Sequence, residues 1–222
     1  MTIPTSRGLL IAAEGLDGSG KSAGLEELGR WLERKGRQVH LVPWERSRSI
    51  ARAAAEPRGR QVLTSRVAAL LGAAEAADRL AREVRGQLDR GDVVLAHRYV
   101  WTAVAREVAR GVDPDWVAAV YRFAPPPDLV IFHRQDASAA LTRALATRPS
   151  PAGTEAVGAA YAGFLDRLIS AYEWLLAGSS PDPWTVRTLV VESDLPSAAR
   201  FAVIRETIRP LLDESARLAA SA

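Results

Sequence analysis

The chain has 222 residues, of which 48% are hydrophobic, and a formal net charge of +3. Its length and the lack of a Pro/Gly/Ser-rich linker favour one domain with a sizeable core. The absence of cysteine excludes disulfides and thiolate metal sites. Basic residues are spread along the chain, which argues against nucleic-acid binding. No apolar run is long enough to span a membrane, and residues 1–8 do not resemble a signal peptide, so we expect a cytoplasmic protein without a membrane partner.

The first predicted element is a strand that leads into a phosphate-binding loop. The apolar run Leu9–Ala13 precedes the letters GLDGSGKS at 15–22, which fit the pattern G-x-x-x-x-G-K-[S/T]. Glycines let consecutive N–H groups point at one anion, and the following helix adds the positive end of its dipole. We expect Lys21 to contact the β- and γ-phosphates of ATP and Ser22 to bind Mg²⁺. The predicted nucleotide site is Gly15, Asp17, Gly18, Ser19, Gly20, Lys21 and Ser22.

Along the rest of the chain, short apolar runs alternate with longer helical patterns, which is typical of a parallel sheet covered on both faces. Strands are predicted at Leu9–Ala13, Gln38–Pro43, Asp92–His97, Asp128–His133 and Val186–Val191. Helices are predicted at Lys21–Lys35, Gln61–Arg90, Val100–Arg110, Pro114–Phe123, Ala137–Leu145, Thr154–Leu176 and Pro196–Ser215. The fold class is therefore α/β, with a five-stranded parallel sheet sandwiched between helices.

Four further motifs follow the loop in a recognisable order. They are DR at 78–79, HRY at 97–99, PDL at 127–129 followed by ALTR at 140–143, and VVES at 190–193. Together with GLDGSGK they resemble the thymidylate kinase family over nearly the whole chain. The resemblance implies a P-loop NTPase fold in one kinase domain over 1–222, with a small lid at about 143–156. It also implies phosphoryl transfer from Mg-ATP to a nucleoside monophosphate, converting dTMP to dTDP, and a possible homodimer.

The resemblance further implies roles for residues outside the loop. Arg98 stands at the carboxyl end of a strand, where open α/β sheets bind ligands, and is expected to bind the acceptor phosphate with Arg79. Asp17 is expected near the sugar and the metal. The loop contains no arginine, so lid arginines are expected to neutralise the transferred phosphoryl group. The predicted catalytic residues are Lys21, Asp17, Arg98, Arg143 and Arg148.

Two residues depart from the family pattern on the acceptor side. His97 stands where the family usually has an aspartate, and Glu75 where it commonly has a phenylalanine that stacks on thymine. A carboxylate offers no stacking face, and placing it against a base has a desolvation cost. Two alternatives therefore stay open: a kinase for another nucleotide or phosphorylated metabolite, and a catalytically silent nucleotide-binding module with a regulatory role.

Three aromatic residues, Trp44, Tyr99 and Trp101, follow strands at the same edge of the predicted sheet. We expect them to line the acceptor pocket, with plain core packing as the alternative for the two tryptophans. The predicted substrate-binding residues are Arg79, Arg98, Tyr99, Glu75, Trp44 and Trp101.

Overall fold

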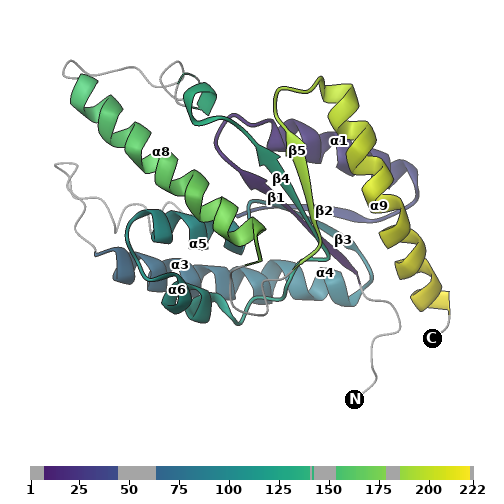
Figure 1. Cartoon of the computed structure of the whole chain (residues 1–222). Coiled ribbons are helices and arrows are strands. Elements are labelled where there is room, and N and C mark those ends of the chain that lie inside the picture. The colour runs from purple at the N-terminus through teal and green to yellow at the C-terminus, as the bar shows by residue number, and fades with distance from the viewer. Residues whose placement is uncertain (1–7, 45–63, 141, 143–153, 179–185, 221–222) are drawn as a thin grey trace.

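The structure, a computed structural model, describes residues 8–44, 64–140, 142, 154–178 and 186–220. These residues form a sheet flanked by helices on both faces (Figure 1). The strands are β1 (Leu9–Gly15), β2 (Val39–Pro43), β3 (Val93–His97), β4 (Leu129–Arg134) and β5 (Thr188–Glu192). They lie in the order β2-β3-β1-β4-β5, and every pair is parallel, which confirms the predicted α/β class.

The helices divide between the two faces of the sheet (Figure 1). One face is covered by α1 (Lys21–Arg34) and α9 (Ser197–Ala220). The other face is covered by α3 (Ser65–Arg79), the π-helical turn η1 (Leu80–Val84), α4 (Arg85–Asp89), α5 (Val100–Ala109), α6 (Pro114–Tyr121) and α8 (Thr154–Leu176). Each layer of helices encloses its own buried cluster of apolar side chains.

The central strand β1 explains how the sheet serves two cores. All of its residues are buried, and successive side chains point to opposite faces. Leu10 therefore packs with the α3–α8 layer, whereas Ile11 packs with α1 and α9. Because both faces of the sheet are covered, the strand appears in the sequence as a continuous run of apolar residues. It could therefore be predicted although apolar and polar residues do not alternate along it.

The five predicted strands are confirmed, with ends that differ by one or two residues. The long helix predicted over 61–90 is interrupted by the π turn at Leu80–Val84, and its first residues, 61–63, lie outside the described part of the chain. The last helix continues beyond Ser215 to Ala220, since residues 216–220 are mostly good helix formers. The predicted helix over 137–145 is described at 137–140 and 142 alone, and these residues are helical.

Most of the predicted lid lies outside the described residues, including Arg143 and Arg148. Its last part, from Thr154, belongs to α8. The single domain over 1–222 stays a prediction. Among the helices that the structure describes, none combines the length and the apolar character that crossing a bilayer requires.

Candidate active site

The register of the sheet brings three strand ends to one edge. Ala13 of β1 pairs with His97 of β3, and Gly15 of β1 pairs with His133 of β4. The loop after β1 and the residues that follow β3 and β4 therefore lie side by side. This is the edge at which parallel α/β sheets bind their ligands.

The loop after β1 has the backbone of a phosphate-binding loop. Gly15 has a φ of 129°, and a Cβ there would lie 2.4 Å from the carbonyl oxygen of His133. Gly20 has a φ of 90° and directly precedes α1. A side chain at either position would strain the backbone or collide with it, so the geometry requires glycine. The N-terminus of α1 then points its free N–H groups into the loop.

Lys21 begins α1 and is folded back under the loop. It is only 3% exposed, and its Nζ donates to the carbonyl oxygen of Leu16 and, at 3.1 Å, to the hydroxyl of Ser19. Burial, and then the charge of Arg98, lowers the pKa of Lys21 to about 7. Phosphate oxygens in place of these neutral acceptors would favour the charged ammonium.

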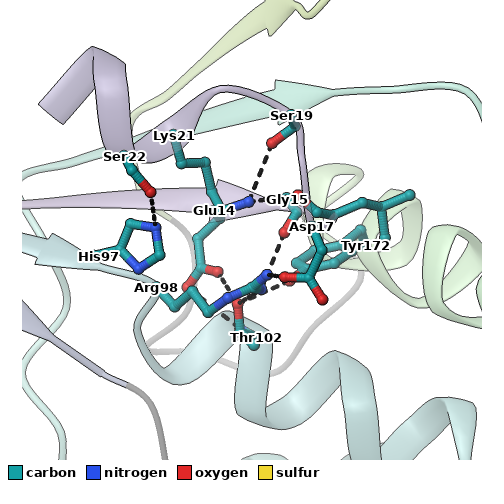
Figure 2. Close-up of polar contacts among 11 residues, drawn as sticks. Glu14, Gly15, Asp17, Ser19, Lys21, Ser22, His97, Arg98, Thr102 and Tyr172 are labelled. Carbon is teal, nitrogen blue, oxygen red and sulfur yellow. Dashed lines mark hydrogen bonds and ion pairs between the residues drawn. The ribbon is translucent and has the colours of Figure 1, made fainter. Parts of the chain in front are cut away.

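Ser22, the predicted metal ligand, is also engaged. Its hydroxyl lies 3.0 Å from Nε2 of His97. Figure 2 shows this pair beside Lys21, at the start of α1. The residue that departs from the family pattern is therefore in direct contact with the hydroxyl that the sequence assigns to Mg²⁺.

Arg98 is the central side chain of the site. It is 4% exposed, and its φ of 68° lies in the left-handed region. Nη1 donates to the carbonyl oxygen of Gly15 at 3.0 Å and to the hydroxyl of Thr102 at 3.2 Å, while Nη2 forms an ion pair with Asp17 (Figure 2). Partial burial opposes ionisation of Asp17, but the charges of Arg98, Arg106 and Lys21 hold the pKa of its carboxyl below the ordinary value.

A cleft with an empty volume of about 440 Å³, here called the Trp44 cleft, lies between α3 and α5. It is lined by Trp44, Gly72, Glu75, Ala76, Arg79, Tyr99, Thr102, Ala103, Arg106 and Tyr121. Arg79 donates to the carbonyl oxygen of Pro43, lies 3.6 Å from a Glu75 oxygen and stands over the Trp44 ring. The Trp44 ring in turn meets Tyr99 edge to face, with centroids 4.7 Å apart. Four of the predicted substrate-binding residues thus come together here.

The other two predicted substrate-binding residues lie elsewhere. Trp101 is 2% exposed and packs in the core, so it does not line the Trp44 cleft. Arg98 does not line it either, because its left-handed backbone directs the side chain back toward the P-loop. Arg98 instead lines a second cleft of about 360 Å³, here called the Asp17 cleft. Its lining residues are Leu16, Asp17, Arg98, Arg106, Ala140, Tyr161, Phe164, Leu165 and Leu168.

Arg106 was missed by the sequence interpretation, although it lines both clefts. Burial, followed by the charge of Arg98, lowers its pKa, as expected for cations held close together. Thr102 and Arg106 are four residues apart on α5 and so share a helix face next to Arg98. This spacing could have identified Arg106 as a candidate site residue from the sequence. The arrangement of Lys21, Arg98 and Arg106 can receive a polyanion, because phosphate oxygens relieve the repulsion between the cations.

Three other contacts with the site come from distant parts of the chain. Glu14 and Tyr172 both pair with Thr102, and Arg200 of α9 donates to the carbonyl oxygen of Ser19 at 3.3 Å. Glu14 could have been identified from the sequence, because it is a carboxylate inside an otherwise apolar strand. Nothing in the sequence pattern distinguished Tyr172 or Arg200 from ordinary helix residues.

Comparisons with known proteins agree with this geometry. A model of the thymidylate kinase family matches residues 13–157. Probable thymidylate kinase 2 of Saccharolobus solfataricus is 40% identical over 156 residues, which are 68% of this chain and 73% of that protein. Probable thymidylate kinase of Thermococcus gammatolerans is 32% identical over 56% of this chain and 64% of its own length. Thymidylate kinase of Xanthomonas campestris pv. campestris is 34% identical over 59% of this chain and 58% of its own length.

The chain thus spans less than two thirds of two of these relatives. The family match nevertheless covers more than half of the chain, including the P-loop, Arg79, Arg98 and both lid arginines. The fold and the site agree with it, because a phosphate-binding loop and buried arginines meet at one edge of a parallel sheet. This protein therefore belongs to the thymidylate kinase family of P-loop kinases, which use ATP as the phosphate donor.

Proposed function

We propose that this protein phosphorylates dTMP to dTDP with ATP as the donor and Mg²⁺ as the metal. The observation that carries the proposal is the hydrogen bond of 3.0 Å from Arg98 to Gly15. It connects the arginine that is expected to bind the acceptor phosphate with the loop that is expected to bind the donor phosphates. The names of the relatives support dTMP as the acceptor.

In this reaction a phosphate oxygen of dTMP bonds to the γ-phosphorus of ATP while the bond from that phosphorus to the β–γ bridging oxygen breaks. Negative charge spreads over the phosphoryl oxygens, so the protein acts by positioning and by cationic stabilisation. Lys21 exchanges its contacts with Leu16 and Ser19 for donor phosphate oxygens. Arg98 exchanges the exposed carboxylate of Asp17 for the acceptor phosphate. Arg143 and Arg148 stay candidates for the charge that the lid supplies.

The residues present fit a magnesium ion. Ser22 presents a hydroxyl oxygen in the first turn of α1, and oxygen is the ligand that Mg²⁺ prefers. Bound there with phosphate oxygens and water, the ion would neutralise charge on the donor phosphates. The Trp44 cleft is the proposed place of the thymine and the sugar, with Tyr99 and Trp44 at its aromatic wall. The homodimer and the cytoplasmic location stay predictions.

The proposal is tested by a coupled ADP-release assay across dTMP, dUMP, the other nucleoside monophosphates and no acceptor, with and without Mg²⁺. We expect release that requires dTMP and the metal. Lys21→Ala is the control, since it removes the charge but not the glycine geometry of the loop. Release without any acceptor, or equal release from Lys21→Ala, would overturn the proposal. Efficient use of a different monophosphate would overturn only the choice of dTMP as the acceptor and would leave the proposed phosphoryl transfer standing.

A further inference from the structure

A carboxylate that the reaction scheme does not use lies directly behind the P-loop. Glu14, in β1, is fully buried. Its Oε1 accepts from the backbone N–H of Thr102 at 3.3 Å, and its Oε2 pairs with the Thr102 hydroxyl. Thr102 lies in the first turn of α5, where N–H groups lack helical partners and the dipole favours negative charge. With no exposed surface, Glu14 has no direct access to a ligand and acts only through its neighbours.

The hydroxyl of Thr102 connects Glu14 to Arg98. Besides Glu14, its Oγ1 lies 3.2 Å from Nη1 of Arg98 and 2.8 Å from the hydroxyl of Tyr172 (Figure 2). A guanidinium can only donate, and a hydroxyl has one proton and two lone pairs. Thr102 therefore accepts from Arg98 and from Tyr172 and gives its own proton to ionised Glu14.

We infer that Glu14, acting through Thr102, is a positioning residue that orients the guanidinium of Arg98 for the acceptor phosphate. The inference rests on the proposed function. Within the described part of the chain, the guanidinium of Arg98 has three partners: Asp17 is exposed and can be exchanged for a ligand, whereas Gly15 and Thr102 are buried anchors. Thr102 differs from Gly15 in that its strength as an acceptor depends on the carboxylate behind it, because hydrogen bonds in a chain polarise one another.

This arrangement depends on the ionisation of Glu14. Burial raises the pKa of Glu14 to about 7, against the opposing effects of the Thr102 hydrogen bonds and of the charges of Arg98 and Lys21. These cations face the carboxylate from the end of β3 and from α1, and the hydroxyl of Tyr172 faces it from α8. A protonated Glu14 must donate to Thr102, since its other oxygen faces an N–H. The hydroxyl that Arg98 contacts then loses its link to a negative charge, and that contact weakens.

The inference is tested by steady-state kinetics of four variants of the full chain. Thr102→Val and Glu14→Gln break the connection to Arg98. Thr102→Ser keeps the hydroxyl, and Tyr172→Phe removes the third partner but leaves the connection intact, so these two are the matched controls. We expect the first two to lower kcat/KM for dTMP about 10- to 100-fold, as for the loss of a charge-assisted hydrogen bond, with an unchanged KM for ATP. Thr102→Ser should recover most of the kcat/KM that Thr102→Val loses, and Tyr172→Phe should lose much less than Thr102→Val.

A pH profile separates positioning from a merely structural role. In the wild type, kcat/KM for dTMP should fall as the pH drops through about 7, because Glu14 takes up its proton there. The ratio of the wild-type value to that of Glu14→Gln should fall over the same range, and this ratio cancels the ionisation of the dTMP phosphate, whose second pKa is about 6. Equal kinetics for Thr102→Val and Thr102→Ser would overturn the inference, and so would identical pH profiles for the wild type and Glu14→Gln. If Glu14→Gln does not fold, the comparison of Thr102→Val with Thr102→Ser decides.

An NMR measurement distinguishes this inference from the proposed function. The Nε–H resonance of Arg98, assigned by its loss in Arg98→Lys, should shift with a midpoint near pH 7 in the wild type and shift much less in Glu14→Gln, where Lys21 is a nearby group that still has a pKa of about 7. A resonance that does not titrate in the wild type would overturn the inference. If no monophosphate is phosphorylated, the proposed function fails, and this titration alone still shows whether Glu14 controls Arg98.

Discussion

The hydroxyl of Ser22 and Nε2 of His97 lie 3.0 Å apart, across the gap between the start of α1 and the end of β3. The contact holds the predicted metal ligand, Ser22, in place through His97, whose imidazole carries no negative charge. An aspartate at position 97 would offer two acceptor oxygens to Ser22 and to water around Mg²⁺, whereas an imidazole offers a single ring nitrogen at a time. The metal side of this site is therefore less negative than the family pattern would make it.

His97→Asp should raise kcat for dTMP about 10- to 100-fold, because hydrogen bonds to a charged group contribute about 1.5–3 kcal/mol. The variant should also need less Mg²⁺ for half-maximal rate. Both quantities come from the ADP-release assay at varied Mg²⁺. His97→Asn is the control, since it adds an oxygen without the charge. An equal gain in both variants would show that the charge is not the cause.

Substitutions of Arg98 should separate the effect of its backbone conformation on stability from the effect of its side chain on activity. At a φ of 68°, a residue other than glycine has an unfavourable backbone, which costs about 1–2 kcal/mol. Arg98→Gly should therefore be more stable in urea unfolding than Arg98→Ala by about 1 kcal/mol. Both should lose kcat/KM for dTMP by about 10- to 100-fold, since both lose the phosphate contact.

Affinity for ATP is the check on the Arg98 assignment. It should be unchanged in both variants, because Arg98 contacts the loop at the carbonyl oxygen of Gly15 and the carboxylate of Asp17, and neither of these is an N–H group that would bind the ATP phosphates. Weaker ATP binding with normal acceptor kinetics would place Arg98 in another role. Equal stability of the glycine and alanine variants would mean that the backbone at this position is not strained.

The P-loop could be predicted from the sequence because its requirements are local. Gly15, Gly20 and Lys21 are close in the chain, and a strand before them with a helix after them leaves one plausible geometry. Arg98 and Trp101 show the limit of such local reasoning. Both follow β3, but whether each side chain faces a cleft or the core depends on the left-handed backbone at Arg98 and on the packing of α5.

The buried polar connections could not be predicted, because they join residues far apart in the chain. Glu14 and Thr102 are separated by 88 positions, and Ser19 and Arg200 by 181. No spacing rule links such pairs, and only the sheet order and the placement of α5 and α9 bring them together. The departure at Glu75 was visible in the sequence, and its spacing of four residues from Arg79 allows an ion pair on one helix face, but the place of that pair beside Trp44 could not be predicted.

Glu75→Phe should lower KM for dTMP about two- to tenfold, because an aromatic pair contributes about 0.5–1.5 kcal/mol beyond the area that it buries. The position lines the Trp44 cleft, and Arg79 keeps its bond to Pro43 when the carboxylate is lost. Substrate titrations in the ADP-release assay measure the change. Glu75→Gln removes the charge without adding a stacking face and should not lower KM. If it lowers KM as much as the phenylalanine does, the carboxylate's charge, and not the missing ring, is what limits binding of dTMP.

Glu14→Gln should change stability in the opposite direction to activity. The folded protein keeps the Glu14 proton up to about pH 7, whereas the unfolded chain releases it near the ordinary value of 4.5. The unfolded state therefore binds fewer protons between these two values, and the wild type loses stability as the pH rises through this window. Glutamine cannot ionise, so the variant is spared this loss.

The free energies of unfolding of the two proteins, measured in urea from pH 4 to 9, should diverge across the window and run parallel above it. The divergence should be on the order of 3 kcal/mol in favour of Glu14→Gln. A carboxylate retained at such a cost is expected where its charge is used, which here means at Arg98 through Thr102. Parallel curves throughout would show that Glu14 ionises as an ordinary carboxyl, and its role would then not depend on pH near neutrality.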